Sequence, residues 1–272
     1  MFGTKQPFTY AECPGCECLQ LTSVPPDLAA FYPNHYYSYR DVAGDAFGLS
    51  PDRLRAAIAF YFAGYGLRSD SRILDVGSGS GSLLNALARA GYSNSLGIDP
   101  YITDDIRLSS GPVIRRADIS QVDAEWDVIL FNHSFEHLTD PAATLEIAWQ
   151  LLAKGGVVVI RMPAVPCHAW SHYKEHWVQL DPPRHVFIHS GKSLAILARA
   201  AGLVHVETRY DSTGFQFWGS ELYRRGVPLS KAKDVLSSVF GWQELAGFEA
   251  RARELNAKRE GDQAAFYLRR AS

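Results

Sequence analysis

The sequence predicts an α/β protein built on a mostly parallel sheet with helices on both faces. Short apolar segments of strand type alternate with amphipathic segments of helical periodicity. The segment Trp126–Asn132 is almost continuously apolar, as expected of a strand buried on both faces of a parallel sheet. The composition of the 272 residues, 47% hydrophobic and 21% charged, is typical of a globular protein.

Seven strands and at least four helices follow from these patterns. Each helix begins at a capping residue and ends near a glycine, as at Ser50-Pro51-Asp52 and Gly64. The other expected helices run from Gly81 to Gly91, from Asp140 to Lys154-Gly155 and from Ser190 to Gly202. The expected strands are Ile73–Val76, Leu96–Asp99, Val113–Ala117, Trp126–Asn132, Val157–Ile160, Leu203–Tyr210 and Gln263–Leu268.

The chain divides into an N-terminal arm, residues 1–49, and a domain over residues 50–272. Residues 217–260 are expected to form a helical insertion that either covers the acceptor pocket or makes a dimer contact. Three of the four cysteines stand in the arm at Cys13, Cys16 and Cys18. A structural zinc site needs four ligands, and Cys167 is far away in sequence, so we expect reduced thiols, with zinc bound by the cluster as the alternative.

Charge and hydropathy exclude several classes of partner. The net charge of −2 gives no basic surface for a nucleic-acid backbone. The sequence has no apolar run near the roughly 18 residues that a membrane span needs. The segment Met1–Pro7 lacks the basic and apolar regions of a secretory signal. We therefore expect a cytoplasmic protein, either a monomer or a homodimer, that acts on a small molecule.

The glycine-rich turn after the first strand indicates a bound cofactor, because bare backbone there can approach a ligand closely. The dinucleotide pattern G-x-G-x-x-G would place its third glycine where Ser82 stands, so that pattern fails. The turn instead has the form Asp75-x-Gly77-x-Gly79-x-Gly81. This form resembles motif I of the Rossmann-like S-adenosylmethionine (SAM) methyltransferases, in which the last strand of the sheet is antiparallel.

The resemblance implies SAM as the cofactor and gives a role to several residues. In that family the acid of the first strand orients the amino end of the cofactor, and the glycines admit its methionine part. Asp99 lies 22 residues after Gly77, where an acid that ends the second strand accepts both ribose hydroxyls. Asp118 matches the family's adenine-binding acid, with Asp123 and Glu125 as alternatives. The cofactor residues so predicted are Asp75, Gly77, Ser78, Gly79, Gly81, Asp99, Pro100, Tyr101, Asp118, Ile119 and Asn132.

The fourth strand leads into His133-Ser134-Phe135-Glu136-His137, the letters of a metalloprotease pattern. Its place beside a SAM-type turn, after a central strand, argues against a protease. A related group of quinone O-methyltransferases has E-x-x-E-H here and can use a divalent metal, whereas this chain has His133 in place of the first Glu. We therefore predict that this segment binds no metal and lines the pocket, with His137 as a candidate base. A metal bound by His133, Glu136 and His137 stays the alternative.

A second group of histidines follows the fifth strand. His168, His172 and His176 recur every four residues and would share one face of a helix. Further on, Trp177, Asp181, Pro183, Arg184 and His185 form W-x-x-x-D-x-P-R-H. This resembles the signature of bacterial methyltransferases found with surface-sugar biosynthesis, as Tyr36-Tyr37-Ser38 resembles a tyrosine motif of the same group. His185 is the leading candidate for a general base; the alternative is an Arg184–Asp181 structural pair beside a buried histidine.

These features predict transfer of a methyl group from SAM to an oxygen or carbon of a sugar or nucleotide sugar. The sugar ring would stack on Trp177 or Trp170. The alternatives are a quinone or phenol O-methyltransferase, a non-catalytic SAM-binding scaffold and a NAD-dependent oxidoreductase.

Overall fold

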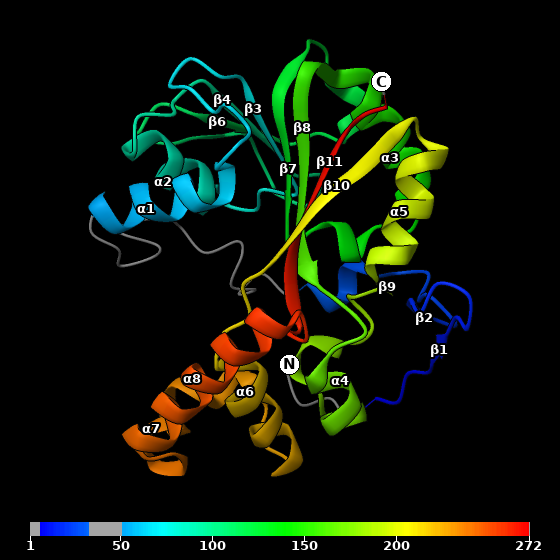
Figure 1. Cartoon of the computed structure of the whole chain (residues 1–272), viewed down its shortest axis with the longest axis vertical. Coiled ribbons are helices and arrows are strands. Elements are labelled where there is room, and N and C mark those ends of the chain that lie inside the picture. The colour runs from blue at the N-terminus through cyan, green and yellow to red at the C-terminus, as the bar shows by residue number, and fades with distance from the viewer. Residues whose placement is uncertain (1–5, 33–50, 272) are drawn as a thin grey trace.

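The computed structural model describes residues 6–32 and 51–271, which fold around an eight-stranded sheet (Figure 1). The strand order is β10-β11-β8-β7-β3-β4-β6-β5. Strands β3, β4, β6, β7 and β8 are parallel, and β11 runs antiparallel to both of its neighbours. The predicted mostly parallel α/β sheet with a reversed last strand is therefore confirmed. The strands are β3 (Ile73–Val76), β4 (Ser95–Ile98), β5 (Ile106–Arg107), β6 (Val113–Arg115), β7 (Trp126–Asn132), β8 (Leu152–Pro163), β10 (Leu203–Tyr210) and β11 (Gln263–Arg270).

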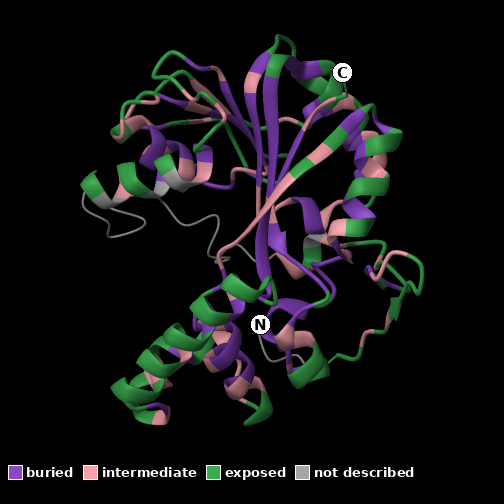
Figure 2. Ribbon diagram, in the orientation of Figure 1, coloured by how far each residue is buried: buried purple, intermediate pink, exposed green. Residues whose placement is uncertain are grey.

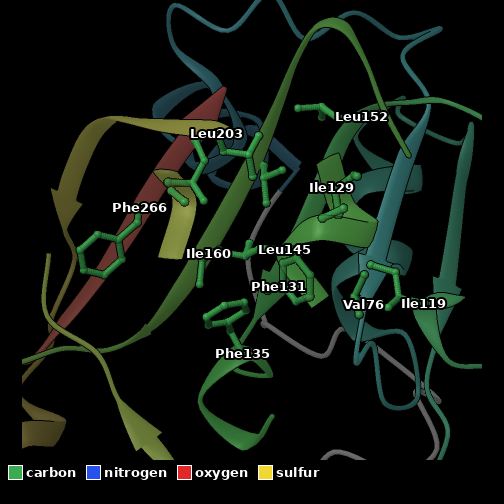
Figure 3. Close-up of a cluster of buried hydrophobic side chains, with 14 of the residues drawn as sticks. Val76, Ile119, Ile129, Phe131, Phe135, Leu145, Leu152, Ile160, Leu203 and Phe266 are labelled. Carbon is green, nitrogen blue, oxygen red and sulfur yellow. The ribbon is translucent and has the colours of Figure 1, made fainter. Parts of the chain in front are cut away.

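Helices cover both faces of this sheet, α1 (Pro51–Phe62) and α2 (Ser82–Arg89) on one and α3 (Pro141–Leu151) and α5 (Gly191–Ala200) on the other (Figure 1). Side chains of the central strands alternate between the two layers, because successive residues of a strand point to opposite faces. In β7, Ile129 and Phe131 pack in the cluster that includes α3 and α5 (Figure 3). Val128 and Leu130 pack on the other face, with α1 and α2. The central strands are buried along most of their length (Figure 2), which explains the continuously apolar sequence of β7.

A second group of helices lies beyond the carboxyl ends of the parallel strands: α4 (His168–Tyr173), α6 (Phe215–Arg224), α7 (Ala232–Val239) and α8 (Trp242–Lys258) (Figure 1). Trp177 stands in their core, fully buried, and its indole Nε1 donates to Asp262 Oδ2 at 2.9 Å. The predicted stacking of a sugar ring on Trp177 is therefore wrong. Helices α6, α7 and α8 fall close to the expected insertion, residues 217–260, whereas α4 precedes it, and the division into arm, domain and insertion stays a prediction.

The N-terminal segment adds a small antiparallel sheet of β1 (Tyr10–Glu12), β2 (Leu19–Leu21) and β9 (Phe187–Ile188). All four cysteines are free thiols, with Cys13 exposed and Cys18 and Cys167 buried. Tyr36-Tyr37-Ser38 and the expected cap Ser50 lie outside the described residues. The 3₁₀ turns are η1 (Ala29–Phe31), η3 (Ile119–Gln121), η4 (Phe135–His137), η5 (Lys174–His176), η6 (Val178–Leu180) and η7 (Leu229–Lys231).

Three local predictions differ from the structure. The helix that begins at Asp140 ends at Leu151, because Leu152 already pairs with Trp126 as the first residue of β8. Helix α4 ends at Tyr173, since Lys174 takes a left-handed φ of 50°, so His176 does not continue a three-histidine face. The two-residue strand β5, which extends the sheet beyond the predicted seven strands, has no period that the sequence could reveal.

No helix in residues 6–32 or 51–271 combines the length and the apolarity that crossing a bilayer requires.

Candidate cofactor and acceptor site

The candidate site lies at the carboxyl edge of the sheet, where the strand order reverses. Strand β3 pairs with β4 on one side and with β7 on the other, and such a reversal point is where open α/β sheets bind ligands. A cavity of about 230 Å³ opens there. Its walls come from the turn after β3, the ends of β4 and β6, and the segment between β7 and α3. Gly77, Asp99, Pro100, Tyr101, Asp118 and Ile119 are the predicted cofactor residues among its lining.

The glycine turn approaches the chain that follows β7 more closely than any other residue type allows. Gly77, Gly79 and Gly81 have φ values of 75°, 55° and 85°, in the left-handed region that favours glycine. A Cβ atom on Gly77 would lie 2.4 Å from the Cβ of Ser134. Ser134 is itself fixed, because its Oγ donates to the Val76 carbonyl oxygen at 2.5 Å. The turn therefore forms one wall of the cavity with bare backbone.

Two buried acids stand behind this turn. The carboxylate of Asp99 accepts hydrogen bonds from Gly79 N and Tyr101 N, both at 2.9 Å, and each oxygen keeps a free lone pair. Asp75 is 2% exposed, and its Oδ1 has no hydrogen-bond partner among the described residues. Burial, together with the charge of Asp99, raises the pKa of Asp75 to about 7. An unpartnered buried carboxyl beside an anion-lined cavity fits the cationic amino end of SAM.

Asp118, Ile119 and Tyr101 line the side of the cavity where the adenine is expected. Asp118 caps η3, accepting from Ser120 N at 3.0 Å and from Ser120 Oγ at 2.8 Å. The ring of Tyr101 stacks on Tyr32 with centroids 5.7 Å apart. Neither Asp123 nor Glu125, the alternatives to Asp118, is among the described residues that line the cavity.

Five predicted cofactor residues are not among the described lining of this cavity: Asp75, Ser78, Gly79, Gly81 and Asn132. The first four lie directly behind the wall, in β3 and its turn. Asn132 points elsewhere: it lines a second cavity, of about 260 Å³, between α1, α2 and the strands β7 and β8. Conversely, Tyr32, His133, Ser134 and Leu138 line the first cavity without having been assigned to the cofactor. His133 and Ser134 belong to the segment expected in the pocket wall, and Leu138 directly follows it. Tyr32 belongs to the aromatic-rich part of the arm, whose tyrosines could line such a pocket.

The two candidate bases meet in space, although only one reaches the cavity. His137 lines it, and its Nδ1 lies 2.9 Å from the Arg184 carbonyl oxygen and 3.1 Å from Tyr32 Oη. His185 is 6% exposed, is not among the described residues of the lining, and stands 4.9 Å from His137 between ring centroids. Arg184 forms a buried ion pair with Asp181, as in the structural alternative for the W-x-x-x-D-x-P-R-H segment.

Glu136 lies under these histidines with no exposed surface. Its Oε1 is 3.5 Å from His133 Nδ1 and 3.9 Å from His185 Nε2. Burial would raise the pKa of Glu136, but the histidines, His133 foremost, lower it to about 2. Burial lowers the pKa of His137, and the charge of Glu136 opposes this shift. The segment 133–137 is not one helical face: His133 has a φ of 55° and only residues 135–137 form a 3₁₀ turn.

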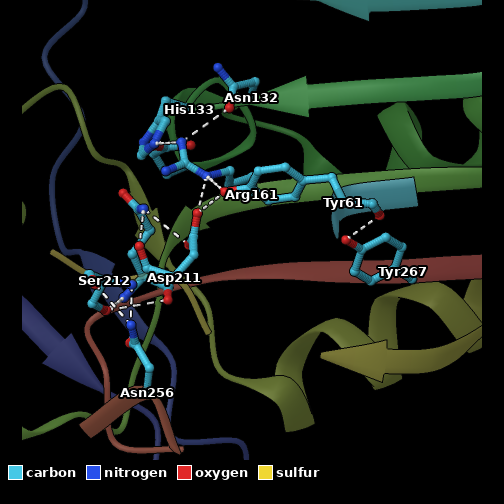
Figure 4. Close-up of polar contacts among 10 residues, drawn as sticks. Tyr61, Asn132, His133, Arg161, Asp211, Ser212, Asn256 and Tyr267 are labelled. Atoms are coloured by element: carbon cyan, nitrogen blue, oxygen red, sulfur yellow. Dashed lines mark hydrogen bonds and ion pairs between the residues drawn. The ribbon is translucent and has the colours of Figure 1, made fainter. Parts of the chain in front are cut away.

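A polar network beside this cluster joins the ends of β7, β8 and β10 (Figure 4). Arg161 donates from Nε to Asp211 Oδ2 at 2.6 Å, and from Nη1 to His133 Nε2 at 2.6 Å and Asn132 Oδ1 at 3.2 Å. Tyr61 contributes its hydroxyl to both Arg161 and Asp211. The sequence did not predict this network, because its members come from four separate segments.

Comparison with known proteins identifies the domain. Residues 49–208 match the model of a protein family described as a methyltransferase domain. The chain belongs to this family of methyltransferases. The predictions of a methyltransferase enzyme and of SAM as its cofactor are thereby confirmed.

Similar proteins agree with the fold. The chain is 33% identical, over 104 residues, to a ubiquinone biosynthesis O-methyltransferase from Psychrobacter arcticus, covering 33% of this methyltransferase chain and 39% of that protein. The chain thus spans well under two thirds of that relative's length. Among solved structures, a candidate sarcosine dimethylglycine methyltransferase from Galdieria sulphuraria is similar at a TM-score of 0.50 with 17% identity, over 81% of this chain and 86% of that one. The [4+2]-cyclase SpnF reaches a TM-score of 0.51 with 18% identity, over 80% of each chain.

Proposed function

We propose that the protein methylates an oxygen or carbon of a small polar acceptor, with a sugar or nucleotide sugar as the first class to test. The observation that supports this most directly is the juxtaposition of two features. A cavity that Asp99 lines, with the buried Asp75 close to it, is also lined by His133 and His137, and Arg161 donates to His133. The first feature suits a cationic nucleoside cofactor, and the second suits an acceptor that must be oriented and deprotonated.

Asp99 would hold the ribose hydroxyls through its free lone pairs, and Asp75 would face the amino end. Asp118 and Ile119 would contact the adenine. When bound, SAM supplies an electrophilic methyl group whose leaving thioether is neutral, so no protein acid is required. The chain's own task is then to orient the acceptor and to remove its proton.

His137 is the base that we propose for this proton. A carbonyl oxygen can only accept, so the Nδ1 of His137 carries the hydrogen toward Arg184 and Nε2 keeps the lone pair. His185 packs edge-on against that ring behind the cavity wall and would act as a positioning residue. A general base contributes about 10²–10⁴-fold to the rate.

The polar network that meets this cavity at His133 supports the proposed acceptor class. Guanidinium, carboxylate and imidazole groups of Arg161, Asp211 and His133 suit an acceptor with several hydroxyls. A phenol or quinone is the second candidate, favoured by the partial identity with the ubiquinone O-methyltransferase. The predicted cytoplasmic location and the monomeric or homodimeric state stay predictions.

Calorimetry with S-adenosylhomocysteine (SAH) and an assay with methyl-labelled SAM test this proposal. Asp99→Ala should weaken SAH binding by at least about 10–100-fold, the value of one hydrogen bond to a charged group. His137→Ala should leave SAH affinity within about twofold while turnover falls by about 10²–10⁴-fold. A panel of nucleotide sugars and phenols identifies the acceptor. Absence of SAH binding, or full turnover in His137→Ala, would refute the proposal. SAH binding without any turnover would favour a non-catalytic scaffold. A thermal shift with NAD but not with SAH would favour an oxidoreductase.

A further inference from the structure

Glu136, His137 and His185 form a compact set of three ligand-type side chains. One carboxylate oxygen of Glu136 and one ring nitrogen of each histidine all lie within 4.8 Å of one another. Glu136 and His185 are buried, and His137 reaches the cavity wall. Within the described part of the chain this is the one group of three or more histidine, cysteine or acidic side chains so arranged.

The carboxylate of Glu136 is the unusual member of this set. It has no exposed surface, and neither of its oxygens accepts a hydrogen bond from a described residue. The nearest histidine nitrogens, at 3.5 and 3.9 Å, stand at or beyond the outer limit of hydrogen bonding. A buried carboxylate without such partners is costly, so native proteins pair it closely or place a metal ion on it.

Both histidines have the second hydrogen bond, from Nδ1 to a backbone carbonyl oxygen, that is common in metal-binding histidines. The Nδ1 of His185 lies 2.8 Å from the Gln179 carbonyl oxygen, and the Nδ1 of His137 lies 2.9 Å from that of Arg184. Since carbonyl oxygens only accept, both Nδ1 atoms carry hydrogens and both Nε2 atoms keep their lone pairs. Metal-binding histidines commonly have this second hydrogen bond to a carbonyl, which fixes the ring and the tautomer.

We propose that Glu136, His137 and His185 bind a divalent transition metal of the zinc type. Two imidazoles and one carboxylate are a donor set that zinc uses in sites with an open fourth position, and imidazole favours such metals over Mg²⁺ and Ca²⁺. The open position would face the cavity, because His137 lines it. The set differs from the His133, Glu136 and His137 of the sequence alternative: Arg161 already donates to His133 Nε2, and the third ligand comes from the loop that ends at His185.

The inference concerns metal binding and does not require the proposed function, although in a metal-bound molecule His137 would act as a ligand and not as a free base. The test uses the full chain, stripped with a chelator and titrated with Zn²⁺ by calorimetry. The background variant Cys13→Ser/Cys16→Ser removes the thiols as competing ligands. We expect one zinc ion per chain in this background, and no comparable binding of Mg²⁺.

Glu136→Gln and His185→Gln should each weaken Zn²⁺ binding by more than about 100-fold, because even the loss of an outer-shell partner costs about 10–100-fold. His172→Gln, which changes an exposed histidine outside the set, should bind zinc like the background. SAH calorimetry on each variant shows that it is folded and separates this test from that of the proposed function. Unchanged zinc affinity in Glu136→Gln, complete loss of zinc in the cysteine background, or equal Mg²⁺ affinity would overturn the proposal.

A crystal of the zinc-loaded wild type gives a second readout that needs no variant. We expect an anomalous peak bonded to Glu136, His137 and His185, and a Co²⁺ form whose visible spectrum lacks thiolate charge-transfer bands. A peak on the N-terminal cysteines alone would overturn the assignment.

Discussion

The two halves of the site are built in different ways. The half proposed for the cofactor, the cofactor half, consists of one turn and the strand ends beside it, and its decisive features are backbone angles and close approach at Gly77 and Gly81. The half proposed for the acceptor, the acceptor half, consists of side chains from four segments that meet beyond β7, β8 and β10, with Arg161 bridging His133 and Asp211. A site made of backbone tolerates almost no added atom, whereas a network of side chains can lose one member and keep the rest.

The largest effect is expected at Gly77, where a substitution should destabilise the turn and prevent cofactor binding. Gly77→Ala would force a left-handed φ on a residue with a Cβ and place that atom 2.4 Å from the Cβ of Ser134. Strain and overpacking together should lower the free energy of unfolding by about 2–6 kcal/mol and abolish SAH binding. Urea denaturation and calorimetry measure the two quantities.

Gly91→Ala is the matched control for this change. Gly91 also has a positive φ, 102°, but no atom lies within 4 Å of the Cβ that alanine would add. Only backbone strain remains, so Gly91→Ala should lower the free energy of unfolding by about 1–2 kcal/mol and leave SAH affinity unchanged. If both variants behave alike, close approach to Ser134 is not what the turn requires.

The next effect concerns the pH dependence of stability at Asp75. Because its pKa is raised to about 7 in the folded protein, the stability that Asp75 contributes is full below its unfolded pKa of about 3.9 and is lost as the pH rises through about 7. The loss amounts to at most about 4 kcal/mol. Asp75→Asn should remove this dependence. The free energy of unfolding of the variant should therefore rise relative to that of the wild type between about pH 5 and pH 8.

Urea denaturation of both proteins across that range measures this difference, and the similar raised pKa of Asp262, about 6, cancels because both proteins share it. SAH should bind the wild type at pH 7 with release of about half a proton, because a group with a pKa of about 7 is half protonated there. Calorimetry in buffers of different ionisation enthalpy measures this release. Parallel stability curves for the two proteins would mean that Asp75 is already ionised in the fold.

The acceptor half should respond more mildly. Asp211→Asn removes the counter-charge of Arg161, and the side chains are 12% and 25% exposed. Removing one partner of a fully buried pair costs about 3–5 kcal/mol, and partial exposure reduces this to about 1–3 kcal/mol. Burial raises the pKa of Asp211, but Arg161 prevails and lowers it, so the pair's contribution should fade as the pH drops toward that pKa.

Thermal unfolding of Asp211→Asn checks the stability, and SAH calorimetry checks the independence of the two halves. SAH affinity should stay within about twofold, because no cofactor contact is altered. Tyr61→Phe, which removes only a shared hydroxyl, should cost about 0.5–1.5 kcal/mol. A large loss of SAH binding in either variant would show that the network also shapes the cofactor cavity.

The same contrast explains what could be predicted from the sequence. The strands β3, β7 and β10 begin and end at the predicted residues, because their periodicity and flanking turns are local. The glycine turn was recognised for the same reason. The meeting of His137 with His185, the burial of Trp177 and the Arg161 network depend on which distant segments pack together. Asn132, which ends the correctly predicted strand β7 but lines the other cavity, shows the limit of motif position alone.

The smallest effect is expected at Asp118, where the cofactor half depends on a side chain and not on backbone. Its carboxylate is exposed and already accepts from Ser120 N and Oγ. Asp118→Ala should therefore cost about 1 kcal/mol of stability, the value of one cap, and should weaken SAH binding by at most about tenfold. Ser120→Ala removes the hydroxyl contact alone, and Ser120 is not among the described residues that line the cavity. If calorimetry finds an equal loss of SAH affinity in both variants, the effect comes from the shape of the η3 turn. A loss confined to Asp118→Ala would assign it to direct contact with the adenine, because Ser120→Ala leaves the carboxylate in place.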